Sequence, residues 1–213
     1  DILAQATSAQ VLWPKLPKLS SLQVMAALRV LLLLCCTAGG EAIHDEARSN
    51  DIRNLELLDR TGAQWEPSNL MKMLNLKEDK TGYTALMAAT LANANASVKF
   101  LLEKRADPTI GDKDGYTPFH GAGWNGSAPA AWYLLKYRLD PSDRHTDGYT
   151  PLHRACKGNE VRHTTMVKFL LLSGVDPEEK SKDGKTCLDL TQNDKTKKKV
   201  KKHINMKKKK EEM

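Results

Sequence analysis

The sequence predicts an array of stacked structural repeats, because two short motifs recur along the chain at nearly constant spacing. The first is a glycine turn, present as DKTGYT, DKDGYT, HTDGYT and SKDGKT, whose glycines Gly82, Gly115, Gly148 and Gly184 are 33, 33 and 36 residues apart. The second is an apolar segment that ends in Asp-Pro, present as VKFLLEKRADP, AWYLLKYRLDP and VKFLLLSGVDP. A fixed period of this length is typical of a solenoid in which each repeat buries its apolar face against the next.

Each repeat is expected to begin with a tight turn and to continue into a helix. Glycine at the turn accepts a positive φ without steric strain. Thr117 and Thr150 then lie where a hydroxyl can cap a helix, and Pro118 and Pro151 follow at the first helical position. The apolar residues beyond them have helical spacing and are expected to form the core between repeats: Leu152, Ala155, Val167, Leu170 and Leu171.

The turn and the Thr-Pro-Phe-His or Thr-Pro-Leu-His that follows it, at a period of 33, resemble the ankyrin repeat. The resemblance covers residues 41 to about 196 as about five repeats, the outer two incomplete. It implies an all-α fold, an ankyrin-repeat solenoid of stacked helix pairs joined by β-turn fingers. Residues 43–63 resemble a helix pair without its leading turn, and the copy from Ser181 loses the pattern after Leu190, so both are expected to cap the array.

Three parts are expected along the chain: a leader over residues 1–40, the repeat domain over residues 41–194 and a lysine-rich tail over residues 195–213. The leader reads MAALRVLLLLCCTAGGEA from Met25, in which Arg29 precedes an apolar run and small residues precede Glu41. This pattern is typical of a signal peptide cleaved after Gly40, and its apolar run is too short to span a membrane. It predicts a protein of the secretory pathway or the extracellular space, with an organelle transit sequence or a weakly helical leader as alternatives.

The net charge of +7 resides in the tail. Residues 195–212 contain ten lysines and two glutamates, so residues 1–194 sum to −1. The run of Lys197, Lys198, Lys199, Lys201 and Lys202 resembles a nuclear import signal and would equally suit a polyanion, either nucleic acid or an anionic membrane. Import would place the protein in the cytoplasm or nucleus and would exclude a secretory signal on the same polypeptide. The remaining alternative is a solvated, partly helical end.

Three departures from the repeat pattern predict local changes of structure. Arg105 and Arg138 replace the glycine that ends the second helix, which Gly174 retains, so these helix ends are expected to be altered or strained. Three extra residues within KGNEVRHTTM are expected to lengthen the turn between the helices of the fourth repeat. The insertion Gln64–Glu78 adds about ten residues after the first repeat, with Ser68 as the expected cap of a short helix. It is either a loop on the binding face or a packed spacer.

The residues that could carry chemistry are interpreted as structural. Residues 121–126 read GAGWNG, which fits a dinucleotide-binding turn, but no strand precedes them and no acidic residue is placed for a ribose. His44, His120 and His153 occupy the histidine position of the repeat, for which the resemblance implies hydrogen bonds to neighbouring turns. No metal-ligand spacing and no recurrent nucleophile accompany them, so we expect no enzyme activity, cofactor, metal or small-molecule substrate.

The four cysteines predict no disulfide framework. Cys156 and Cys187 lie in adjacent repeats, but Cys187 aligns with Pro151, five positions before Cys156. A disulfide requires Cα atoms within about 7 Å of each other, so we expect both cysteines to be small packing residues. Asn95 and Asn125 begin glycosylation sequons, which would be usable only behind a true signal peptide.

The resemblance implies protein–protein recognition without catalysis, through the finger tips and the concave face of the first helices. We expect a monomer that binds another protein, and we expect the aromatic residues to anchor it, with bracing of adjacent repeats as the alternative. Carried over position by position, the surface comprises Lys80, Tyr83, Lys113, Asp114, Tyr116, Trp124, Asn125, Thr146, Asp147, Tyr149 and Lys157. One alternative is polyanion targeting through the tail. Another is the recognition segment of a larger enzyme, because no methionine precedes Met25.

Overall fold

The computed structural model describes residues 39–56 and 67–212. The chain divides into two compact units, Asp1–Gly39 and Gly40–Met213. The helices described below lie in the second unit, except that the first helix begins one residue earlier, at Gly39. The predicted leader, including the signal peptide expected from Met25, lies outside the described residues except for its last two positions.

Every regular element of the described residues is a helix. The first is α3, Gly39–Arg48, residues 52–56 are also helical, and the insertion contributes α5, Pro67–Leu74. Three helix pairs follow: α6 (Ala85–Leu91) with α7 (Asn95–Glu103), α8 (Pro118–Asn125) with α9 (Ala128–Lys136), and α10 (Pro151–Lys157) with α11 (Val161–Leu172). The last pair is α12 (Cys187–Leu190) with α13 (Asp194–Glu211). None of the described helices has both the length and the apolar character needed to cross a membrane.

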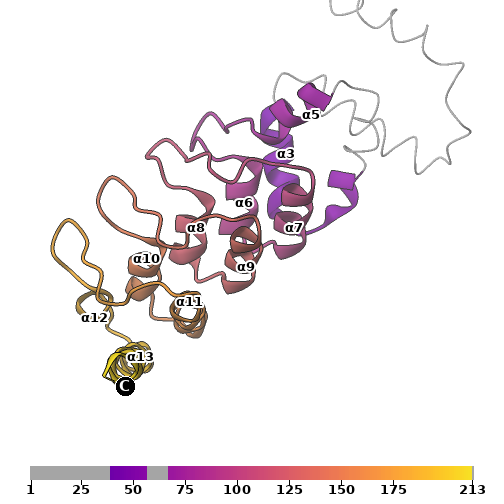
Figure 1. The fold of residues 1–213 in the computed structure, drawn as a ribbon. Helices are drawn as coiled ribbons and strands as arrows, with labels where there is room; N and C mark the ends of the chain where they lie inside the picture. The colour runs from indigo at the N-terminus through magenta and orange to yellow at the C-terminus, as the bar shows by residue number, and fades with distance from the viewer. Residues whose placement is uncertain (1–38, 57–66, 213) are drawn as a thin grey trace, which may run out of the picture. The chain divides into compact units, whose positions relative to one another are not determined.

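The helix pairs stack side by side in two layers (Figure 1). The first layer contains α6, α8, α10 and α12, each in contact with the next. The second layer contains α7, α9, α11 and α13 in the same order. The loops that lead into α8, α10 and α12 project from the stack as fingers (Figure 1). The predicted all-α solenoid of stacked helix pairs is therefore confirmed.

The interface between repeats forms the hydrophobic core of the array. The residues predicted to form it are at most 4% exposed: Leu152, Ala155, Val167, Leu170 and Leu171. Leu101 and Leu134 occupy the position of Leu170 in the two preceding repeats and are fully buried. Burial of one such side chain is worth about 1.5–3 kcal/mol. Because the buried faces meet between repeats, each helix pair depends on its neighbours for stability.

The first-layer helices begin as the sequence predicts, with one difference. Pro118 and Pro151 are the first residues of α8 and α10. The hydroxyl of Thr150 accepts the backbone N–H of the third residue of α10 at 3.4 Å and caps that helix. The equivalent hydroxyl of Thr117 lies 2.9 Å from Nδ1 of His120 and accepts no backbone N–H. The GAGWNG stretch forms the end of α8 and the turn after it, as predicted.

Arg105 and Arg138 both adopt the left-handed conformation that the missing glycine would have taken, with φ of 66° and 64°. Gly174 has φ of 90° at the same place in the fourth repeat. In each case the N–H of the next residue closes the helix on a backbone carbonyl, as Ala106 does on Leu101 at 2.9 Å. The turn therefore keeps its hydrogen bond while each arginine bears a strain of about 1–2 kcal/mol.

Arg105→Gly and Arg138→Gly are each expected to raise the free energy of unfolding by about 0.5 kcal/mol. Relief of left-handed strain outweighs the greater freedom of glycine in the unfolded chain. Denaturant unfolding measures the change. Gly174→Ala is the matched control: a Cβ there meets no atom within 4 Å, so only backbone strain acts and a loss of about 1 kcal/mol is expected. Destabilisation by the arginine substitutions would contradict the assignment of strain.

The three extra residues of the fourth repeat lengthen a helix rather than the turn, so that prediction is wrong. α11 has 12 residues, whereas α7 and α9 have 9 each. An α-helix turns once in about 3.6 residues, so an insertion of three residues keeps the apolar face of α11 nearly in phase. Val167 and Leu170 accordingly remain fully buried.

The predicted insertion Gln64–Glu78 forms α5 in its described part, and residues 64–66 lie outside the described residues. α5 begins at Pro67 and not after Ser68, so the expectation that Ser68 caps the helix is wrong. Proline suits the first helical position because its missing N–H would have no partner there. Met73 and Leu74 are 9% and 3% exposed, which favours the packed-spacer alternative over a binding loop.

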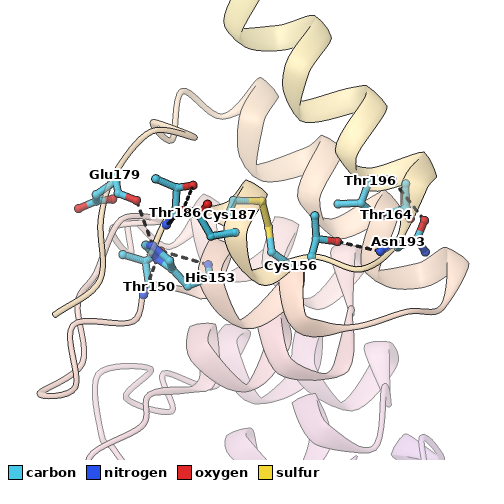
Figure 2. The surroundings of a disulfide bond; sticks show 11 residues. Thr150, His153, Cys156, Thr164, Glu179, Thr186, Cys187, Asn193 and Thr196 are labelled. Carbon is cyan, nitrogen blue, oxygen red and sulfur yellow. Dashed lines mark hydrogen bonds between the residues drawn. A yellow bond between two sulfur atoms is a disulfide. The ribbon is translucent and has the colours of Figure 1, made fainter. Parts of the chain in front are cut away.

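Cys156 and Cys187 form a disulfide, so the expectation that they lie too far apart is wrong (Figure 2). Their Cα atoms are 5.5 Å apart, and both residues are buried. The expectation placed α12 in register with α10. α12 is a single turn, held by hydrogen bonds from Thr186 to the carboxylate of Asp189, and is too short for helix packing to impose that register. The start of α12 therefore lies beside the end of α10.

Candidate functional site

Side chains join the fingers of neighbouring repeats to one another. The Tyr116 hydroxyl donates to Oδ2 of Asp147 in the next finger at 2.9 Å. The Tyr149 hydroxyl donates to Oδ2 of Asp183 in the finger after that, at 3.3 Å. The His145 ring stacks on Tyr116 with ring centroids 3.8 Å apart. The tyrosine after the turn glycine therefore braces adjacent fingers in these two repeats.

Arg154 of α10 lies at the centre of this arrangement. Its guanidinium carbon is 4.5, 4.7 and 5.9 Å from the ring centroids of Tyr116, Tyr149 and Trp124. Its Nη2 donates to Oδ2 of Asp147 and to the Tyr116 hydroxyl. The Arg154 side chain is 10% exposed, so the carboxylate provides the opposite charge that a buried cation requires.

Opposing effects set the charge of the Asp147 carboxylate. Burial alone would raise its pKa, but the backbone N–H of Tyr149, the ring of His145, the hydroxyl of Tyr116 and the charge of Arg154 together hold the pKa well below its ordinary value. Burial raises the pKa of Tyr116, and its hydrogen bond to Asp147 adds to that effect. At neutral pH the cluster therefore pairs a charged carboxylate and a charged guanidinium with a neutral phenol.

A cleft of about 350 Å³ lies beside this cluster and spans three successive repeats. Trp124 borders it and is 59% exposed. Gly121 and Met87 form part of its apolar floor, where there is no room for a side chain at position 121, because a Cβ there would lie 2.9 Å from Sδ of Met87. An exposed aromatic ring over an apolar floor, with carboxylates of Asp112 and Asp114 at the edge, is suited to burying a side chain of a partner.

Two of the three repeated histidines contact a neighbouring loop, whereas Nε2 of His120 is buried without a hydrogen-bond partner among the described residues. Nε2 of His153 lies 3.1 Å from the carbonyl oxygen of Glu179, and Nε2 of His44 lies 3.1 Å from that of Leu76. Burial lowers the pKa of His120 and of His153, which keeps both rings neutral. Across residues 39–56 and 67–212, no three His, Cys, Asp or Glu side chains gather in a group that could hold a metal ion.

Two family models match most of the repeat region. One, described as ankyrin repeats (3 copies), matches residues 43–145, and the other, described as ankyrin repeats (many copies), matches residues 134–190. The chain belongs to the ankyrin repeat family. No curated protein matches it closely enough to count as a relative. Ankyrin repeats are generally protein–protein interaction modules.

In the structure, the predicted partner-binding residues differ in how far their side chains are exposed to solvent. Six are exposed: Lys80, Lys113, Asp114, Trp124, Thr146 and Lys157. Four are half-buried, namely Tyr83, Tyr116, Asn125 and Asp147, and Tyr149 is 7% exposed. Asn125 donates its amide to the Leu91 carbonyl at 2.8 Å, which ties it to the preceding repeat. The geometry favours bracing for Tyr116 and Tyr149 and leaves Trp124 as the exposed aromatic residue of the surface.

Sequence reasoning missed Arg154. It occupies the position held by Ala88 and Gly121 in the two preceding ankyrin repeats. The change from small residues to arginine at this position of a first-layer helix could have identified Arg154 as a candidate from the sequence. Its partners were harder to infer, because Tyr116 is 38 residues away and reaches Arg154 only through the stacking of the repeats.

The predicted basic tail is α13, the second helix of the last helix pair. α13 packs on α11 through Thr196, Val200 and Ile204, which are at most 8% exposed. The predicted polyanion-binding lysines lie on its other faces: Lys198, Lys199, Lys201 and Lys202 are exposed, and Lys197 is half-buried. Deletion of the chain after Asp194 would uncover α11, so point substitutions are the cleaner test of this helix.

Proposed function

We propose that the chain is a non-catalytic protein-interaction module that binds another protein on its finger tips and the concave face of its first-layer helices. The observation that carries this proposal is Trp124, a large aromatic side chain that is 59% exposed beside a cleft with an apolar floor. Tryptophan is enriched among the residues that dominate binding energy. Fingers braced through Tyr116, Asp147 and Arg154 reduce the entropy that binding would otherwise cost.

Trp124→Ala is expected to weaken binding of the protein partner by about 2 kcal/mol, roughly 30-fold in Kd, with little change in the free energy of unfolding. Affinity capture with the full chain and mass spectrometry identifies the partner, and titration calorimetry measures its affinity for parent and variant. Tyr116→Ala is expected to lower the unfolding midpoint, because Tyr116 braces the next finger.

Trp132→Ala is the matched control for Trp124→Ala. Trp132 lies on α9 of the second layer and is 51% exposed, so its loss removes a similar ring from the opposite layer. We expect it to leave the affinity unchanged. Equal losses for the two tryptophan variants, or none for either, would exclude the concave face as the binding surface.

A second proposed function is polyanion binding through α13. The lysines of this helix are displayed on an element fixed by packing, which supports the proposal. Such binding should weaken steeply with salt, because it is driven by the release of counterions. Salt-independent binding would exclude this contact.

The proposed location is the secretory pathway or the extracellular space, with the cytoplasm or nucleus as the alternative. The buried Cys156–Cys187 disulfide supports an oxidising compartment, in agreement with the signal-peptide pattern from Met25. The redox state of both cysteines in protein isolated from its own source tests this location, since free thiols would contradict it.

A further inference from the structure

A groove between α11 and α13 concentrates lysines on one face of a helix. The groove has a volume of about 920 Å³. Lys195, Lys198, Lys199 and Lys202 line it, at helical positions i, i+3, i+4 and i+7, so they share one face of α13. The opposite wall offers amide and hydroxyl groups from Asn159 and Thr165.

Packing and hydrogen bonds fix the position of this lysine face. The Thr164 and Thr196 hydroxyls are 2.8 Å apart across the α11–α13 interface (Figure 2). The Asn193 amide donates to the Asn159 carbonyl at 2.7 Å. The Asn193 Oδ1 also caps α13 by accepting the Lys195 N–H at 2.9 Å. The lysine side chains therefore project from a backbone that is already ordered before any ligand binds.

The groove keeps a net positive charge, because its lining carboxylate, Asp194, faces four lining lysines and pairs with Lys197 at 3.9 Å. Among the described residues, none of its four lysines has a carboxylate within 4 Å. Elsewhere on α13, Lys207 lies 3.6 Å from Asp176 and Lys208 lies 3.8 Å from Glu178. Lysines four residues apart repel each other along the groove face, and a bound anion would relieve that repulsion.

The chemistry of the groove discriminates among polyanions. A membrane-binding helix needs a free apolar face, but α13 uses Val200 and Ile204 against α11. Proteins that hold single-stranded nucleic acid stack its bases on aromatic rings, and no described lining residue is aromatic. A sulfated sugar chain needs only closely spaced ammonium groups and polar partners for its hydroxyls. The buried disulfide of the neighbouring pair suits an oxidising compartment, where such chains occur.

We propose that the α11–α13 groove binds a sulfated polysaccharide of the glycosaminoglycan class, with sulfates on Lys195, Lys198, Lys199 and Lys202. This rests on the polyanion-binding function proposed above and narrows it to one ligand chemistry and one face of α13. The side-chain amide of Asn159 is then available to the sugar hydroxyls, and the Thr165 hydroxyl, which donates to the Val161 carbonyl at 3.1 Å, can accept a hydrogen bond from them.

The test compares two double variants of the full, oxidised chain on immobilised heparin. K195Q/K199Q removes two lysines that line the groove. K197Q/K201Q removes the same charge at the same spacing from two lysines that line an adjoining hollow of α13 and not the groove. At 0.15 M salt, the groove variant is expected to bind about tenfold more weakly and to show a salt slope lower by about 2. The control variant is expected to lose less than about threefold.

Duplex DNA, unsulfated hyaluronan and phosphatidylserine vesicles serve as competing probes. We expect heparin to bind most tightly of the four. Equal losses for the two double variants, or tighter binding of DNA or vesicles, would overturn the groove proposal while leaving polyanion binding intact. Failure of every probe to bind at 0.15 M salt would overturn both.

Discussion

Replacing Cys187 with serine is expected to lower the free energy of unfolding of the oxidised protein by about 3–4 kcal/mol. The Cys156–Cys187 disulfide has a sequence separation of 31 residues. A cross-link of this length removes many conformations from the unfolded chain, and the variant regains them. Denaturant unfolding of parent and variant, followed by circular dichroism, measures the difference.

Cys156→Ser and reduction of the parent provide the controls. Both are expected to cause a loss similar to that of Cys187→Ser, and the double variant should lose little more than either single variant, because all three remove one bond. In reducing buffer, parent and Cys187→Ser should differ by only about 1 kcal/mol, the effect of an ordinary substitution. If reduction left the unfolding midpoint of the parent protein unchanged, the disulfide would not constrain the unfolded chain.

The fold could be predicted because most of it is encoded locally within each repeat. The turn glycine, the proline at the first helical position and the apolar spacing of Leu152 and Ala155 each specify structure over a few residues. The last pair escaped prediction because its register depends on packing: α12 is one turn long, and only contacts with α10 place Cys187 beside Cys156. Repeat alignment shows that the fourth repeat has three extra residues, but it does not show whether they lie in a helix or in a turn. The extension of α11 therefore could not be predicted from the sequence.

The candidate site shows the same division. The sequence predicted Trp124 and the finger tyrosines as parts of one binding surface, and the structure leaves Trp124 exposed. The sequence could not show that the hydroxyl groups of Tyr116 and Tyr149 donate hydrogen bonds to the next finger, because those bonds join residues of different repeats. The same limit applies to α13, where the burial of Thr196, Val200 and Ile204 separates two lysine faces that appear as one run in the sequence.

Asp147→Asn is expected to lower the free energy of unfolding by about 2 kcal/mol. The amide keeps an oxygen for the Tyr149 N–H, which donates to Oδ1 at 2.9 Å, but it removes the charge opposite Arg154. Removal of one partner from a fully buried ion pair costs about 3–5 kcal/mol. The Asp147 side chain is 35% exposed, so water compensates for part of the loss. Denaturant unfolding at neutral pH measures it.

Asp114→Asn is the matched control, because Asp114 precedes the turn glycine one repeat earlier and is exposed. It should change stability by less than about 0.5 kcal/mol. In the Arg154→Met background, where no buried cation remains, Asp147→Asn should destabilise by at least about 1 kcal/mol less than in the parent. Equal effects in both backgrounds would show that the two charges act independently. If they are coupled, Asp147 also positions Arg154 beside the Trp124 ring, 5.9 Å from its centroid, and Asp147→Asn should then weaken partner binding as well as stability.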